Sequence, residues 1–132
     1  MFEFLRMNNS AVVAPTIKLV QATNAVAYAV GDALVLTSGA LTKAGATVKP
    51  LYIAAQKYPA NAAAGEIAVY PVNSEMEWKT TFAADGSAIV AGNAVTLHTD
   101  SAQVTATTTS GVATVVKKLG TGASGTSVVV KF

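Results

Sequence analysis

The stretch VGDALVLTS, Val30–Ser38, occurs a second time in a looser form as AGNAVTLHT, Ala91–Thr99. A shift of 61 residues places Gly31 on Gly92 and aligns apolar side chains in the run that follows each glycine. A repeat of this length is too long for a solenoid unit and suits a small β-module that is present twice.

The match extends on both sides of this stretch. The same shift aligns Lys18 with Lys79 and Leu51–Lys57 with Val112–Lys118, and a shift one residue shorter aligns Ala64–Val72 with Ser124–Phe132. We therefore predict an N-terminal arm over residues 1–15, a first β-module over 16–72 and a second over 73–132. A lone module of this size buries little surface, so we expect the two to pack as one compact domain.

The pattern within each module is typical of short strands. Val- and Thr-rich runs alternate with Gly, Asn, Asp and Ser, and Trp78, Thr80 and Phe82 share one face of a period-two run. The predicted strands are 16–21, 26–30, 33–37, 40–43, 50–56, 66–72, 76–82, 87–90, 93–98, 102–107, 112–118 and 126–132. Such spacing predicts an all-β fold, with each module a small barrel or sandwich.

The composition argues for a scaffold or adhesive protein before an enzyme. Charged residues make up 12% of the chain, against roughly 25% in ordinary soluble domains. The few lysines are scattered, so we expect no nucleic-acid partner. No apolar run is long enough to predict a membrane span, and the N-terminus does not have the pattern of a secretory signal.

Three motifs resemble catalytic or ligand-binding sites, but each also has a purely structural explanation. Gly120–Gly125 matches G-x-G-x-x-G, but the strand-like TSVVVKF follows it where a dinucleotide site needs a helix. His98 and Asp100 can pair at a strand end, and Glu75 and Glu77 suit a solvated face beside a buried Trp78. With one histidine and no cysteine, we predict no catalytic residue, no metal site and no cofactor.

Candidate contact residues come from the arm and from the tyrosines. In the arm, Phe2, Phe4 and Leu5 have no counterpart in the repeat to cover them, and Arg6 could reach an acidic rim. The arm is predicted either to dock and contribute to attachment or to fray, and a start at Met7 is a further alternative. The predicted interface residues are Phe2, Phe4, Leu5, Arg6, Tyr58 and Tyr70.

The second module carries a resemblance to a known family. Glu77–Phe132 resembles the capsid decoration proteins of tailed bacteriophages, also called cement or head-decoration proteins. The likeness lies in a G-[DN]-x-V-x-L strand at Gly92–Leu97, a Thr-rich hairpin, a Gly-Val-Ala strand at Gly111–Ala113 and a closing V-x-V-x-F strand at Val128–Phe132. The first module carries a looser version in Val30–Leu36 and Ile67–Val72.

The resemblance implies a β-rich structural protein without chemistry. Its expected partner is the major capsid protein, on the outer surface of the assembled capsid, and its expected state is a homotrimer. Its expected location is the virion, after synthesis in the host cytoplasm. Low charge and short β-modules, which leave apolar surface to cover, also favour self-association. The alternative is a glycan- or receptor-binding module of a phage fibre or cell surface, since exposed aromatic side chains could form a sugar platform.

Overall fold

The computed structural model describes residues 1–7, 15–60, 62–63 and 65–132. None of these residues is helical, and ten strands form two antiparallel sheets, which confirms the predicted all-β fold. The strands are β1 (Glu3–Met7), β2 (Lys18–Gln21), β3 (Ala33–Thr37), β4 (Ala40–Lys43), β5 (Tyr52–Ala54), β6 (Glu66–Pro71), β7 (Met76–Thr81), β8 (Ala94–Val95), β9 (Ala113–Lys118) and β10 (Ser127–Lys131).

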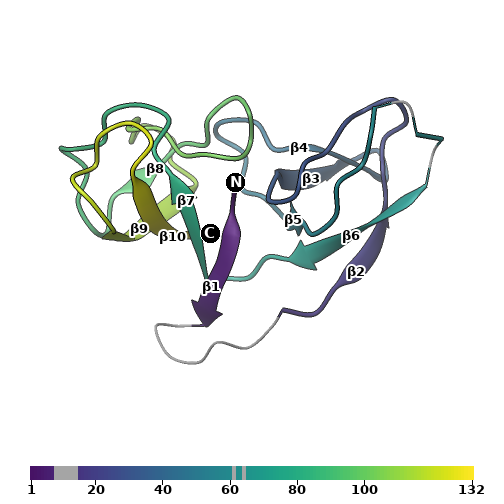
Figure 1. The fold of residues 1–132 in the computed structure, drawn as a ribbon, viewed down its shortest axis with the longest axis horizontal. Helices are drawn as coiled ribbons and strands as arrows, with labels where there is room; N and C mark the ends of the chain where they lie inside the picture. The colour runs from purple at the N-terminus through teal and green to yellow at the C-terminus, as the bar shows by residue number, and fades with distance from the viewer. Residues whose placement is uncertain (8–14, 61, 64) are drawn as a thin grey trace.

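The two sheets have the same order of strands. The first runs β2-β6-β5-β3-β4, and the second runs β1-β7-β10-β9-β8. Thus β7, β10, β9 and β8 occupy the places of β2, β6, β5 and β3, and the two sheets lie at opposite ends of the molecule (Figure 1). Val104, which bridges to Leu97, stands where the first module has β4.

The repeat also fixes the strand register. Ala33 pairs with Ile53 in the first sheet, and the residues 61 positions later, Ala94 and Thr114, pair in the second. One-residue slips in a strand exchange its buried and exposed faces, so a preserved register means that both modules keep the same inward-facing positions.

Each module begins its central hairpin with a glycine in the left-handed region. Gly31 has φ 82° and Gly92 has φ 91°, a conformation that other residues adopt at a cost. The amide of Gly31 donates to the carbonyl of Ala54 at 2.8 Å, and that of Gly92 donates to the carbonyl of Val115 at 2.8 Å. The sequence match at these glycines therefore reflects one conserved turn geometry within the chain.

A buried or half-buried side chain closes the same turn in both modules. Asp32 Oδ2 accepts from the amide of Ala29 at 2.9 Å, and Asn93 Oδ1 accepts from the amide of Val90 at 3.0 Å. The predicted strands 26–30 and 87–90 lead into these turns and are not strands in the structure. Apolar runs of this length suggested strands, but the capped turns give the backbone a different set of hydrogen bonds.

The pairing of β2 and β7 shows that the sequence alignment of these two strands is wrong by one residue. Ala22, just after β2, bridges to Leu41, and Phe82, just after β7, bridges to Val104, so these two bridges occupy the same place. The shift here is 60 residues, which puts Trp78, not Lys79, in the place of Lys18. The ladders put β6 on β10 with a shift of 61, so the shorter shift predicted for Ala64–Val72 is wrong. The matched lysines were a coincidence of residue type.

The described part of the predicted arm is a strand of the second sheet. Residues 3–7 form β1, which pairs antiparallel with β7 and crosses in front of the junction between the sheets (Figure 1). The rest of the predicted arm up to residue 14 lies outside the described residues. The amide of Phe2 also donates to the carbonyl of Gly31 at 3.0 Å, so the start of the chain contacts both modules.

The apolar interior forms two clusters, of which one lies within the first module and the other includes residues of both modules. The first module alone supplies the smaller one, which comprises Ala22, Tyr28, Leu34, Leu41, Ala54, Tyr58, Ile67 and Val69. The larger one surrounds Trp78 and Phe82 in the second module and extends to Phe2, Ala33, Ala44 and Ile53. Trp78 and Phe82 are both fully buried, as the alternation predicts, and the shared cluster joins the modules.

Candidate binding surface

Three of the six predicted interface residues meet at one place. Phe2 and Phe4 approach from the N-terminal strand, and Tyr70 approaches from β6 of the first module. Together they line an open apolar groove of about 470 Å³ at the junction of the two modules. The remaining lining residues are Met1, Glu3, Pro15, Val30 and Ala54.

Phe2 and Phe4 are held in place by aromatic contacts within the chain. Phe2 is only 2% exposed and packs edge-on against Phe132, with ring centroids 5.3 Å apart. Phe4 is half-buried and packs edge-on against Trp78 at 5.6 Å. Phe2 therefore has an intramolecular cover that the sequence did not reveal, and it forms the floor of the groove more than a contact surface.

Leu5 and Arg6 lie on the same strand without lining the groove. Leu5 is half-buried at the point where the register of β1 on β7 shifts by one residue. Arg6 Nε donates to Glu77 Oε2 at 2.8 Å. The Glu77 side chain is only 5% exposed, so the solvated face predicted for it is wrong. Because Glu77 would otherwise be a buried charge without a partner, Arg6 serves first to neutralise it.

Tyr58 lies apart from the other five. It is 7% exposed within the smaller cluster, and its ring centroid is 6.0 Å from that of Tyr28. Its hydroxyl donates to the carbonyl of Ala63. A buried, hydrogen-bonded tyrosine is an ordinary core residue, so the structure gives Tyr58 no place on the groove.

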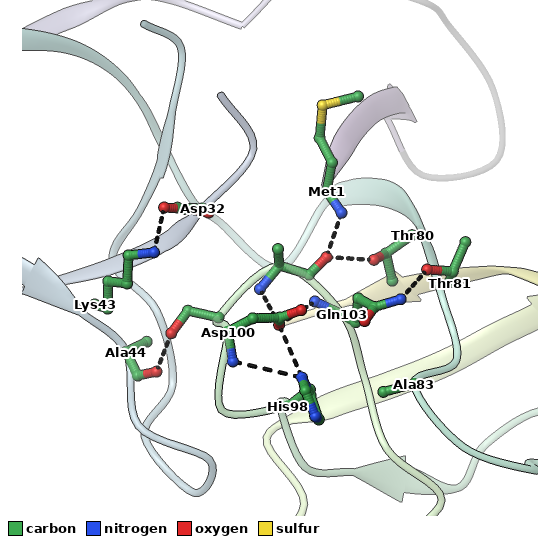
Figure 2. A network of polar contacts seen from close by, with 12 residues as sticks. Met1, Asp32, Lys43, Ala44, Thr80, Thr81, Ala83, His98, Asp100 and Gln103 are labelled. Carbon is green, nitrogen blue, oxygen red and sulfur yellow. Dashed lines mark hydrogen bonds and ion pairs between the residues drawn. The ribbon is translucent and has the colours of Figure 1, made fainter. Parts of the chain in front are cut away.

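The His98–Asp100 pair belongs to a polar network that extends to Met1 (Figure 2). His98 Nδ1 lies 3.2 Å from Asp100 Oδ1, and both side chains are about 40% exposed. Partial burial opposes ionisation of Asp100, but hydrogen bonds from the backbone of Ala102, from His98 and from the backbone of Gln103 outweigh it and lower the pKa of that carboxyl. Among the described residues, no hydrogen bond between the His98 ring and a hydroxyl group is recorded.

The same network ties the modules together. Ser101 Oγ donates to the carbonyl of Ala44 at 2.8 Å, and the amino group of Met1 donates to the carbonyl of Ala102 at 2.6 Å (Figure 2). Thr80 Oγ1 donates to that same carbonyl at 2.8 Å. The loop around Ser101 thus positions the N-terminal strand against both modules.

Other kinds of site find little support in the described part of the chain. It contains no group of three or more His, Cys, Asp or Glu side chains that could hold a metal ion. It also contains no helix with the length and apolar character of a membrane span. The G-x-G-x-x-G segment is the loop between β9 and β10, as its context predicted.

Sequence reasoning did not find the lining residues of the first module. Val30 and Ala54 reach the groove because the turn at Gly31 and the end of β5 lie against the start of the chain. A long-range signal that links residues 1–4 to residues 30 and 54 would be needed to predict this. Local patterns in a single sequence do not contain such a signal.

Comparison with models of protein families, with curated proteins and with solved structures finds no match to this chain.

Proposed function

We propose that this protein is a structural component of a tailed-phage virion that binds the outer surface of the assembled capsid. It stabilises the shell by bridging subunits of the major capsid protein. The observation that carries the proposal is the open apolar groove at the junction of two low-charge β-modules, because such surfaces mark contact with partners. The pattern resemblance of Glu77–Phe132 to decoration proteins supports the same assignment.

The physical basis of the function is linkage. A protein that binds only the expanded shell adds its binding free energy to that state and so stabilises it against the alternatives. A rigid body suits this task, and here the shared core joins both modules, while the partly buried Arg6–Glu77 pair holds β1 against β7. We further propose a homotrimer, either free or on the capsid, made in the host cytoplasm and located on the virion surface.

The test is co-sedimentation of the purified protein with expanded empty capsids and with unexpanded procapsids of the phage that encodes it. Binding is expected to the expanded form with strong preference. Absence of binding to both would contradict the proposal. Light scattering of the free protein, together with a cryo-microscopy map of decorated particles, tests the trimer. A monomer in both settings would contradict only the trimer.

A second candidate is glycan or receptor binding. The groove has a volume within the range of small-molecule sites and is lined by Phe4 and Tyr70, on which a sugar ring could stack. Retention on a glycan array, with loss of retention in Tyr70→Ala, would favour this candidate. Capsid binding without glycan retention would exclude it.

A further inference from the structure

The two sheets differ in whether a further strand pairs with their equivalent edges. In the second sheet, β1 pairs with the outer edge of β7. In the first sheet, β2 holds the place of β7 at the end of the sheet, and β4 reaches its outer side only at the bridge between Ala22 and Leu41, so none of the described strands is recorded as a partner of the outer edge at Lys18 and Leu19. β2 lies at the periphery of the molecule (Figure 1), so another strand can approach it. An unpaired edge is a template for strand addition.

The side chains at the two edges differ in a systematic way. With the shift set by the bridges of Ala22 and Phe82, Leu19 takes the place of Lys79 and Ile17 takes the place of Glu77. Lys79 and Glu77 each form an ion pair with a residue of β1. Leu19 is 63% exposed and Ile17 is 54% exposed, so the open edge presents apolar groups where the covered edge presents charges.

On the opposite face of the sheet, the same strand carries a positively charged side chain. Lys18 lies between Ile17 and Leu19, corresponds to Trp78 and is exposed, and no ion pair of Lys18 is recorded among the described residues. The edge therefore alternates apolar, basic, apolar. A strand that pairs with it gains most if it alternates apolar, acidic, apolar, because directly opposed side chains interact.

This pattern decides between the chains that could supply the strand. β1 alternates in the opposite sense, since Glu3 and Arg6 flank Phe4 on the register of β7. On β2 the strand β1 of a second copy would place its two charges against apolar groups and its phenyl ring against Lys18. Pairing of β2 with β2 of a second copy would leave Lys18 without an acidic partner. A different protein is the better donor.

We infer that the outer edge of β2 accepts an extended strand of the capsid subunit, with apolar side chains against Ile17 and Leu19 and a carboxylate beside Lys18. Naming the capsid subunit as the donor rests on the proposed function. The geometry of acceptance is the one that the chain uses internally when β1 adds to β7. Main-chain hydrogen bonds would supply affinity, and the alternating side chains would supply specificity.

The backbone of Leu19 is directed toward the open edge. Leu19 pairs with Ala68, whose carbonyl accepts from Ala55 on the other side of β6 at 2.9 Å. Since bonded and non-bonded pairs alternate in an antiparallel ladder, the amide of Leu19 points away from β6 and is available to a partner. Replacing that amide is therefore expected to leave the pairing of β2 with β6 intact.

Three variants separate the two parts of the inference. Leu19→Pro removes the edge amide and keeps an apolar group, whereas Leu19→Lys keeps the amide and installs the residue of the covered edge. Leu119→Lys is the matched control, because Leu119 is 47% exposed on the second module. Circular dichroism and thermal unfolding test whether all three are folded.

The measurement is saturation binding to expanded capsids, with hydrogen exchange of the segment 16–22 in the free and bound protein. Leu19→Pro and Leu19→Lys are each expected to lower the affinity by about tenfold or more, and Leu119→Lys to leave it unchanged. The amide of Leu19 should gain protection on the capsid. Unchanged affinity of both Leu19 variants, or no gain of protection, would overturn the inference while the proposed function stands. Failure of the unsubstituted protein to bind capsids would overturn both.

Discussion

The two modules share a strand order but differ in what surrounds them. The second module receives β1 on its edge, and its core continues into residues of the first. The first module keeps a separate small core and an open edge. Duplication within one chain therefore preserves the turns and the register, and the residues change where the neighbourhood changes.

The capped turns illustrate the same lesson at the level of one residue. Asn93 closes its turn as a neutral amide, whereas Asp32 does so as a carboxylate that is 2% exposed and lies 2.9 Å from the amino group of Lys43. The two residues perform the same backbone task. Only the first module adds an ion pair to it, because only there does a lysine on β4 reach the turn.

The largest expected effect comes from removing β1. Deleting residues 1–7 removes Phe2, whose full burial is worth about 1.5–3 kcal/mol, and the half-buried Phe4, whose contribution is smaller. It also leaves Glu77 buried without Arg6. We expect the free energy of unfolding, measured by urea denaturation, to fall by several kcal/mol.

Hydrogen exchange of the deletion variant tests the difference between the modules. Amides of β7 and β10 should lose protection before those of β3 and β5, since β1 pairs only with the second sheet. Equal loss in both modules would mean that the chain unfolds as a single unit. No change in stability would contradict the structural role of β1.

The equivalent glycines provide a matched pair with a smaller effect. An added Cβ at Gly92 would meet open space, whereas one at Gly31 would lie 2.3 Å from the Cγ atom of Met1. Gly92→Ala should therefore cost about 1–2 kcal/mol of backbone strain alone. Gly31→Ala should cost about 1–3 kcal/mol more, because the start of the chain is displaced. Equal losses in chemical denaturation would show that β1 docking does not depend on this contact.

The capped turns give a third comparison. Lys43→Ala leaves the buried carboxylate of Asp32 without its cation, and we expect a loss of about 1–3 kcal/mol. Asp32→Asn copies the second module and should change stability by less than about 1 kcal/mol, since the amide can still accept from Ala29. If Asp32→Asn destabilises as much as Lys43→Ala, the ion pair contributes more to the turn than the cap does.

The smallest effect is expected at the exposed pair. His98→Ala should change stability by less than about 0.5 kcal/mol at neutral pH, because exposed ion pairs contribute little. The pKa of Asp100 is lowered on folding, so its contribution is present above the unfolded value and is lost as the pH falls through the folded value. Removing His98 should raise that pKa, as carboxyl titration by NMR can measure. A large loss of capsid binding in His98→Ala would instead favour an active role.

Much of the fold could be predicted from the sequence, because the patterns that indicate strands and turns are local. The runs at 33–37 and 40–43 match β3 and β4, and Gly31 and Gly92 mark turns whose φ values select glycine. The shift at β7 was misjudged since the chain between Phe82 and β8 is one residue longer than its counterpart. Insertions in loops leave no trace in strand patterns.

The candidate site was harder to predict because it is assembled from distant segments. Phe2 and Phe4 looked uncovered, and nothing near them in the sequence indicates that Phe132 and Trp78 would cover them. The groove, in turn, depends on Val30 and Tyr70, which belong to the other module. Local composition predicts that aromatic residues will be used, but the partner of each is set by tertiary packing.

The contact between Phe2 and Phe132 brings the two ends of the described chain together, as the N and C labels in Figure 1 also show. The first and last described residues therefore lie close together in space. A short linker between the present ends, with a new break in the loop between β9 and β10, should give a circularly permuted protein with the same two sheets. Under the proposed function, such a permutant would move the attachment point for a fused domain away from the groove to the far end of the second module.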